Sequence, residues 1–217
     1  MLIGAHQPNY LPNLAFFHKM KRANLFVIVT NIQFEKQEGW QQRHKIGGPN
    51  GDIWLTVPVL GSQNQLIRDV QIHNAVPWSK KHLRTLELTF AKSKGREFLP
   101  IFKKLYEREW TRLVDLNVAA ILAIKDILGI DTQVVIDEEV TGKRSSLLIK
   151  ICKKYQAQEY LSGVGWKLYI KDEDIEKFEK EGLKHKVVEK NLTALHPYST
   201  IHYLLKEGKE WVNEQIA

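Results

Sequence analysis

The chain opens with a short apolar strand, a turn stiffened by two prolines and the beginning of a helix. The strand is expected over Leu2–Ala5 and the helix over about residues 13–22. Pro8 and Pro12 have fixed φ angles, and the residue before Pro12, Leu11, is pushed towards extended geometry. Such a unit favours an open α/β sheet, and the carboxyl end of its first strand is where such sheets place ligands.

Polar side chains are dense in this opening turn. Five side chains within eight residues can form hydrogen bonds: His6, Gln7, Asn9, Tyr10 and Asn13. A connecting loop does not need so many donors and acceptors. His6 is the best acid or base candidate, because an unperturbed imidazole titrates near neutral pH. The alternative is that His6 is a hydrogen-bond donor that only holds the turn together.

The rest of the chain alternates strands with helices, which indicates an α/β fold. Strands are expected at 25–29, 52–59, 67–72, 133–136, 158–161 and 184–188. Helices are expected at about 78–91, 96–110, 113–128, 145–155, 173–181 and 199–205. We expect one domain over residues 1–217, with a mainly parallel sheet and helices on both faces. An inserted β-hairpin turns at 47–51, and two to three helices form a helical segment at about 78–128.

Composition narrows the compartment and the partners. Cys152 is the single cysteine, so a disulfide framework is excluded and a reducing cytoplasm is the simplest location. Cys152 itself is expected to be a small buried hydrophobe. No run approaches the ~20 apolar residues of a membrane span. The net charge of +7 favours anionic partners, namely nucleotides, nucleotide-sugars, tRNA or an anionic membrane surface, although a Lys/Glu-rich surface can also be a heat-stability trait.

Several common site types have no pattern here. The eight histidines are scattered, none pairs at the i, i+4 spacing of a helical metal site, and there is no cysteine cluster. A Walker phosphate loop and a Gly-x-Ser-x-Gly nucleophile elbow are also absent from the sequence. We therefore expect no metal site and no cofactor.

Besides Lys143–Ser146, which opens a helix and could bind an anion or serve only as a cap, two further polar segments follow strands or turns and could meet the opening turn. The first contains Gln33, Lys36 and Arg43, of which the two cations could neutralise a phosphate or a carboxylate. The second begins at Ser162 and Gly163, where the backbone could approach an anion closely. The alternatives are an exposed hairpin face for the first segment and a bare turn for the second.

The six tryptophans are spread along the chain and show no clustered pattern. Trp54 lies in the returning arm of the predicted hairpin, and Trp78 begins a predicted helix. We expect both indoles to pack in the core rather than to stack on bases.

A set of segments shares a recognisable pattern. These are His6–Pro12, Phe16–Lys19, Asn31–Lys36, Trp54–Val59, Tyr160–Gly163 and Ser199–Ile201, with Trp40, Arg43, Ile46, Trp78 and Gly208. Together they resemble the WbqC-like family over nearly the whole chain. The chain departs from that pattern at four positions. Thr30 and Asn31 stand where acidic residues are expected, Gln42 replaces an Asn, and His202 replaces an Asp. If the acidic residues of the family pattern bind a metal or act as a base, this chain lacks them.

The resemblance implies a role in O-antigen or other surface-polysaccharide biosynthesis, with a suggested glycine transferase activity. We therefore expect a transferase that passes an acyl or aminoacyl (glycyl) group to an amino-sugar nucleotide and forms an amide. His6 would act as general base or hydrogen-bond donor, while Gln7, Asn9 and Tyr10 would orient the substrate and stabilise the oxyanion. Substrate binding is assigned to Gln33, Lys36, Arg43, Ser162 and Gly163.

The donor and the activity itself have alternatives. The activated acyl donor could be an aminoacyl-tRNA, an acyl-adenylate or an acyl-CoA. A competing hypothesis is a non-catalytic module that binds a nucleotide-sugar or RNA within a biosynthetic assembly. A nucleotidyl transferase that uses His6 is a third hypothesis, weakened by the lack of paired carboxylates for Mg²⁺ near the opening turn.

Overall fold

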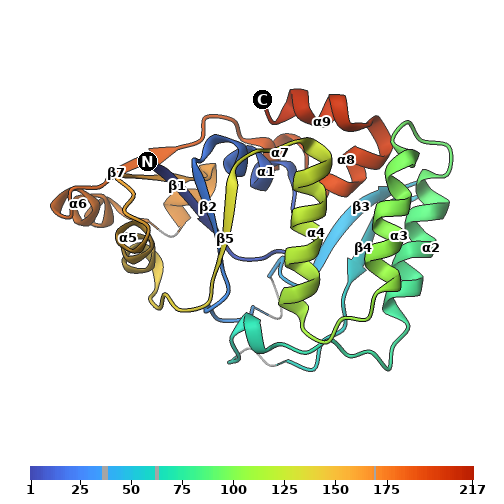
Figure 1. The fold of residues 1–217 in the computed structure, drawn as a ribbon. Coiled ribbons are helices and arrows are strands. Elements are labelled where there is room, and N and C mark those ends of the chain that lie inside the picture. Colours follow the sequence, from blue (N-terminus) through green and yellow to red (C-terminus); the bar gives the residue numbers. More distant parts are fainter. Residues whose placement is uncertain (36–38, 62–63, 169) are drawn as a thin grey trace.

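Figure 1 shows the computed structural model, which describes residues 1–35, 39–61, 64–168 and 170–217. Within these ranges, five parallel strands form one sheet in the order β5-β2-β1-β6-β7. The strands are β1 (Leu2–His6), β2 (Leu25–Val29), β5 (Gln133–Asp137), β6 (Glu159–Ser162) and β7 (Lys184–Val187). The predicted α/β class with a mainly parallel sheet is confirmed.

The described chain also forms helices. They are α1 (Leu14–Arg22), α2 (Trp78–Phe90), α3 (Leu99–Glu107), α4 (Leu113–Leu128), α5 (Arg144–Lys154), α6 (Asp172–Lys180), α7 (Leu192–Leu195), α8 (Thr200–Glu207) and α9 (Lys209–Gln215). No helix in the described ranges is both long enough and apolar enough to cross a membrane.

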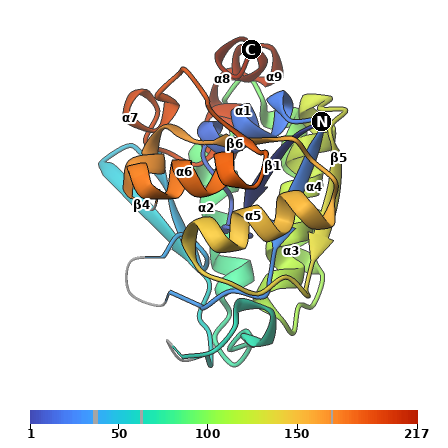
Figure 2. The same cartoon turned by 90° about the vertical axis from the view of Figure 1, so that its left-hand side faces the viewer.

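The sheet is covered on both faces, as predicted. Every residue of β2 is buried, which explains its unbroken apolar run, because a covered parallel strand has no solvent side. On one face Phe16 of α1 packs edge-on against Phe26. On the other face Cys152 of α5 and Phe178 of α6 lie in a second apolar core, and Figure 2 shows these two helices together. Cys152 is fully buried, as predicted, and burial raises the pKa of its thiol to about 12.

The chain between β2 and β5 forms the predicted hairpin and helical segment. Strands β3 (Arg43–Gly48) and β4 (Gly51–Thr56) pair antiparallel, and α2 packs on α3, which packs on α4 (Figure 1). The strand predicted at 67–72 is wrong. A 3₁₀ turn, Ile67–Asp69, forms there because the Val70 N–H bonds back to the Ile67 carbonyl.

The C-terminal helices tie α1 to the hairpin. The helix predicted at 199–205 is α8, and α9 follows it without having been predicted. Gly208 between them has a φ of +95°, a conformation that glycine adopts readily. The Gly47 N–H of β3 donates to Nδ1 of His202 in α8 over 3.2 Å, and Nδ1 of His18 in α1 contacts the Ile216 carbonyl at 3.2 Å.

The winding of the sheet reverses between β1 and β6. From β1 the chain runs through α1 to β2 and reaches β5 at one edge, and α5 then returns it to β6 on the other side of β1. Counted within the sheet alone, the strand order is 3-2-1-4-5, as in doubly wound nucleotide-binding folds. In such folds ligands bind beyond the carboxyl ends of the strands at this reversal. His6 ends β1 and Ser162 ends β6, so both flank what we call the switch point.

Candidate functional site at the switch point

His6 is half-buried at the carboxyl end of β1. Its ring packs edge-on against Phe16, with the centroids 4.9 Å apart. Nδ1 lies 2.9 Å from the Gln7 carbonyl oxygen, which can only accept, so Nδ1 carries the proton. Nε2 has no partner among the described residues and is left as an acceptor. Burial, with a smaller contribution from Lys19, lowers the pKa of His6 to about 4, so the ring is neutral at pH 7.

Lys19 projects from α1 towards the gap between β1 and β6. Its side chain is almost completely buried. Nζ donates to the Ala5 carbonyl over 2.7 Å and lies 5.3 Å from the Tyr160 ring centroid. No carboxylate in the described part of the chain forms an ion pair with it. Burial lowers the pKa of Lys19 to about 7, so this amine is poised either to lose its proton or to bind an anion.

Ser162 and His185 form a polar pair across β6 and β7. Oγ of Ser162 lies 2.8 Å from Nε2 of His185, whose ring stacks on Tyr160. Burial and the charge of Lys19 lower the pKa of His185. Lys19 therefore acts electrostatically on a histidine on each side of the switch point. We call His6, Lys19 and His185 the basic cluster.

The segment after β6 leaves open space beside this cluster. A methyl group added at Gly163 would meet no described atom within 4 Å, and one added at Gly165 would meet Leu168 at 3.9 Å. The segment continues as a 3₁₀ helix, Val164–Leu168. Packing therefore requires neither glycine, and the backbone at Gly163 borders open space.

Amide side chains hold the opening turn. Oε1 of Gln7 accepts from Nε2 of Gln41 over 3.0 Å. Asn117 of α4 is fully buried and donates to the carbonyls of Pro8 and Gln41, each over 2.7 Å. The Oδ1 atoms of Asn9 and Asn117 are buried and lack a partner in the described ranges. Buried acceptors usually have one, so both can accept from a bound ligand or water.

Tyr10 does not join His6. Its hydroxyl is fully buried, 2.9 Å from Nδ1 of His82 and 2.6 Å from the hydroxyl of Tyr106. Burial lowers the pKa of His82 to about 4, so this neutral ring can accept from Tyr10 while Tyr10 accepts from Tyr106. Tyr10 therefore anchors the opening turn to α2 and α3, and its hydroxyl proton is already used.

Leu11 departs from the predicted extended geometry. Its φ is +45°, in the left-handed region, where a leucine is strained. The side chain is completely buried in the main core, and this burial offsets the strain. The prediction is wrong because the local preference before Pro12 is weaker than the gain from burying Leu11.

Of the predicted phosphate-binding segment, Gln33 and Arg43 are described, and Lys36 lies outside the described residues. The Gln33 carbonyl accepts from Nε2 of Gln41 over 3.4 Å, while its side chain is exposed. Arg43 begins β3, and its guanidinium carbon lies 5.0 Å from the Trp54 ring centroid. The shared contacts of Gln41 with Gln7 and Gln33 bring this segment to the same end of the sheet as His6.

The two tryptophans predicted to lie in the core differ. Trp78 is buried, as predicted, but 48% of Trp54 is exposed. Its ring stacks on that of Trp40, which is 41% exposed. The prediction for Trp54 is wrong because of strand alternation, which turns the neighbouring Leu55 into the core and Trp54 towards solvent.

The positions that depart from the family pattern have structural partners. Thr30 and Asn31 donate to the backbone carbonyls of Asp137 and Glu139 over 3.1 and 3.3 Å, which joins the ends of β2 and β5. His202 accepts a backbone N–H of the hairpin, as described above. Across the ranges that are described, no group of three or more His, Cys, Asp or Glu could hold a metal ion.

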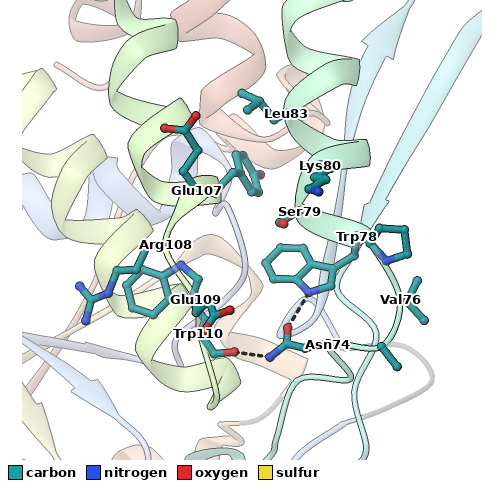
Figure 3. A pocket seen from close by; sticks show the side chains of 13 residues that line it. Asn74, Val76, Trp78, Ser79, Lys80, Leu83, Glu107, Arg108, Glu109 and Trp110 are labelled. Carbon is teal, nitrogen blue, oxygen red and sulfur yellow. Dashed lines mark hydrogen bonds between the residues drawn. The ribbon is translucent and has the colours of Figure 1, made fainter.

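A cavity of about 520 Å³ lies elsewhere, on the helical segment (Figure 3). Nε1 of Trp78 donates to Oδ1 of Asn74 over 3.1 Å, and Nδ2 of Asn74 donates to the Trp110 carbonyl over 2.8 Å. These polar groups of the lining are already paired with one another. The basic cluster and the open acceptors lie at the switch point instead, so we centre the candidate site there.

The sequence prediction did not include Lys19 or His185 among the site residues. Lys19 had a usable signal, because it lies three residues after Phe16 and four before Ala23, on the apolar face of the predicted helix. His185 had none, because it stands in a short strand between two exposed lysines.

Comparison with known proteins finds a family and a relative. A family model described as the WbqC-like protein family matches residues 7–202. The uncharacterized protein Rv1507c of Mycobacterium tuberculosis (strain ATCC 25618 / H37Rv) is 31% identical over 170 residues, which cover 76% of this chain and 73% of that protein. No solved structure matches. The matched region contains Lys19, Ser162 and His185 and begins directly after His6.

Proposed function

The chain belongs to the WbqC-like protein family, and from that premise we propose that it is a transferase that forms an amide bond. The acyl or aminoacyl group, such as glycyl, passes to the amine of an amino-sugar nucleotide in surface-polysaccharide (O-antigen) biosynthesis. We assign the reaction to the cytoplasm, because the single cysteine, Cys152, is free and buried and leaves the chain without a disulfide framework.

The observation that carries the proposal is the burial of Lys19 beside His6 at the switch point, with no carboxylate partner in the described ranges. An anionic substrate group would compensate the charge of such an ammonium. In the 3-2-1-4-5 order the phosphates of a nucleotide come to this end of the sheet. Lys19 therefore holds a phosphate of the substrate, together with Arg43, while Lys36, which the sequence assigns to the same role, lies outside the described residues.

His6 handles the proton of the reacting amine. The amine nitrogen attacks the carbonyl carbon of the activated acyl group, the N–C bond forms, and the bond from that carbon to the leaving group breaks. The proton released from the amine passes to Nε2 of His6 and then to the leaving group or water. Because the pKa of His6 is lowered to about 4, the ring is neutral before the reaction and returns the proton readily.

The opening turn orients the reacting groups. Oε1 of Gln7 is bonded to Gln41, which leaves the Gln7 amide nitrogen to donate to the oxyanion. Oδ1 of Asn9 accepts from the substrate, since it is buried without another partner in the described part. The open space beside Gly163 admits the sugar, while Ser162 is completely buried and supports the site through its hydrogen bond with His185. The proposal gives no catalytic role to Tyr10, whose hydroxyl is occupied.

A transfer assay with the purified chain tests this function. Amino-sugar nucleotides are offered with a glycyl-tRNA, a glycyl-adenylate or an acyl-CoA, and amide formation is followed by mass spectrometry. His6→Ala is expected to lower the rate at least about a hundredfold, the usual scale for losing a general base, and Lys19→Met is expected to lower it through loss of the phosphate contact. Lys21→Met, an exposed lysine on the same helix, is the matched control and is expected to keep full activity.

Two outcomes would count against the transferase. Equal transfer by the wild type, His6→Ala and Lys19→Met would remove the roles given to the cluster. Absence of transfer with every donor, together with RNA binding that weakens steeply with salt, would favour the non-catalytic binding module.

A further inference from the structure

Two tryptophans face solvent on the hairpin beside the opening turn. Trp40 is 41% exposed and Trp54 48% exposed, with ring centroids 6.0 Å apart and planes inclined by 24°. The guanidinium carbon of Arg43 lies 5.0 Å from the Trp54 centroid. We call Trp40, Arg43 and Trp54 the aromatic platform. Tryptophan is enriched at binding surfaces, and adjoining exposed aromatic side chains are a feature of such surfaces.

The hairpin register fixes the platform. Trp54 is paired directly with Lys45, and Arg43 stands two residues before Lys45 on the same face of the ladder. The opposite face is closed by His44 and Leu55, both buried. Trp54 therefore contributes little to the core, and its size needs another explanation.

The platform is joined to the opening turn through backbone and side-chain hydrogen bonds. The Tyr10 N–H donates to the Trp40 carbonyl over 2.9 Å. Nε2 of Gln41, the next residue, donates to Oε1 of Gln7 over 3.0 Å. Gln7 follows His6 and Gln41 follows Trp40, so the hydrogen bond between Gln41 and Gln7 links the platform to the switch point.

We infer that the aromatic platform binds the base of a nucleoside diphosphate, which stacks on the indoles while Arg43 contacts the attached phosphate. This inference rests on the proposed function, because the base belongs to the nucleotide whose sugar reacts near His6. Every nucleobase has a π face that an indole can stack on. A planar guanidinium held beside an indole is well suited to phosphate oxygens.

The charges of the hairpin face favour a small nucleotide over a long single strand of RNA. Nζ of Lys45, next along the face, is paired with Asp52 at 2.7 Å, and the Tyr198 hydroxyl donates to the same carboxylate over 3.0 Å. A carboxylate at this place interrupts the basic track that a polynucleotide backbone needs. The face therefore suits a base with its own phosphates.

Binding of UDP and ADP to the full chain, followed by calorimetry and tryptophan fluorescence, tests the inference, with inorganic pyrophosphate as the probe without a base. Both nucleotides are expected to bind and to change the tryptophan emission. Trp54→Ala and Trp40→Ala are expected to weaken nucleotide binding by roughly tenfold or more, the scale of one lost base stack, and to leave pyrophosphate binding unchanged. Trp54→Phe is expected to retain most of the affinity.

Leu88→Ala is the matched control, because Leu88 is an exposed apolar side chain on α2 and is 63% exposed. It is expected to bind both nucleotides like the wild type. Unchanged UDP and ADP affinity in both tryptophan variants would overturn the inference. So would an equal loss of pyrophosphate binding, a wild type that binds neither nucleotide, or a single-stranded RNA that binds more tightly than UDP through Trp54.

Transfer kinetics separate this inference from the proposed function. The tryptophan variants are expected to raise the KM for the amino-sugar nucleotide and to leave kcat near the wild-type value. Transfer that depends on His6 and Lys19 but is indifferent to Trp40 and Trp54 would refute the platform alone. Loss of all transfer with intact nucleotide stacking would refute the transferase alone.

Discussion

Nζ of Lys19 lies 2.7 Å from the carbonyl oxygen of Ala5, and this contact holds an amine between β1 and β6. A single carbonyl compensates an ammonium less well than a carboxylate, and burial lowers the pKa of Lys19 to about 7. The fold therefore carries a destabilising group at the point where a doubly wound sheet binds its ligand. Destabilisation of this kind is typical of functional sites.

Replacing this amine is expected to stabilise the free protein. Lys19→Met keeps the apolar stem of the side chain and removes the buried charge. The folded pKa is below the unfolded one, so the unfolded state binds more protons between about pH 7 and 10 and wild-type stability rises through that window. The advantage of Lys19→Met should thus shrink by roughly 3 kcal/mol from pH 7 to pH 10. Urea unfolding of the wild type and of Lys19→Met at both pH values measures this change. A difference in the free energy of unfolding that stays constant with pH would contradict the lowered pKa of Lys19.

Anion binding at the switch point is expected to take up a proton. At pH 8 most Lys19 is neutral, because its pKa is about 7, and a bound anion favours the charged form. Calorimetry with sulfate in buffers of different ionisation enthalpy should give uptake approaching one proton at pH 8. The uptake should vanish below about pH 6, where Lys19 is already charged, and in Lys19→Met at either pH. Equal uptake by both proteins would assign the proton elsewhere.

Gly163→Ala is expected to separate folding from binding. The added methyl group meets no described atom within 4 Å, so the thermal midpoint should stay close to that of the wild type. A ligand that fills this space would collide with it, and binding of the amino-sugar nucleotide should weaken. The control is Lys184→Ala in the nearby strand β7, because Lys184 is exposed and its backbone is unstrained. Gly182→Ala is unsuitable, because Gly182 has a φ of +69° and an alanine there would be strained. Unchanged binding in Gly163→Ala would move the ligand away from β6.

The helices and strands that the sequence predicts best are those whose pattern lies within a few neighbouring residues. The apolar run of β2 and the long apolar helix α4, closed by Gly129 at a φ of +65°, need only neighbouring residues to be recognised. The adjacency of the carboxyl ends of β1 and β6, where His6 and Ser162 stand, depends on the strand order instead. No local pattern says that β6 returns to the side of β1, since that is decided by the packing of α5 on the opposite face of the sheet.

The surroundings of two aromatic side chains, Tyr10 and Trp54, also depend on residues distant in sequence. Tyr10 and Trp54 are both large and aromatic, and composition favours burying both. The ladder register decides that Trp54 faces solvent, whereas Tyr10 enters the core because His82 and Tyr106 satisfy its hydroxyl. Both outcomes depend on partners distant in sequence.

Tyr10→Phe is expected to lower stability without removing catalysis. The change leaves Nδ1 of His82 and the hydroxyl of Tyr106 without their shared partner in a buried site. Loss of a buried hydrogen-bond partner costs about 1–3 kcal/mol. Chemical unfolding should show this loss, while kcat under folded conditions should stay within about threefold of the wild type, far from the scale of a lost catalytic group. A fall of kcat on the scale of His6→Ala would instead place the Tyr10 hydroxyl in the reaction.

Asp137 is expected to control the stability of the sheet edge in acid. Its buried carboxylate accepts from Nζ of Lys154 over 2.6 Å, from the Tyr155 hydroxyl over 2.7 Å and from the backbone N–H groups of Glu139 and Val140 over 2.9 and 2.7 Å. Burial alone would raise its pKa, but these hydrogen bonds outweigh it and lower the pKa to about 2. The charged form therefore stabilises the fold above about pH 4, and this contribution is lost as the pH falls towards 2.

Asp137→Asn should accordingly cost about 2 kcal/mol at pH 7, and the difference from the wild type should disappear near pH 2. Unfolding by urea at a series of pH values measures both quantities. Asp131→Asn, an exposed carboxylate in the loop before β5, serves as the control and should follow the wild type throughout. A loss in Asp137→Asn that is the same at pH 2 and pH 7 would show that shape rather than charge makes Asp137 important, because only the charged form gains from Lys154.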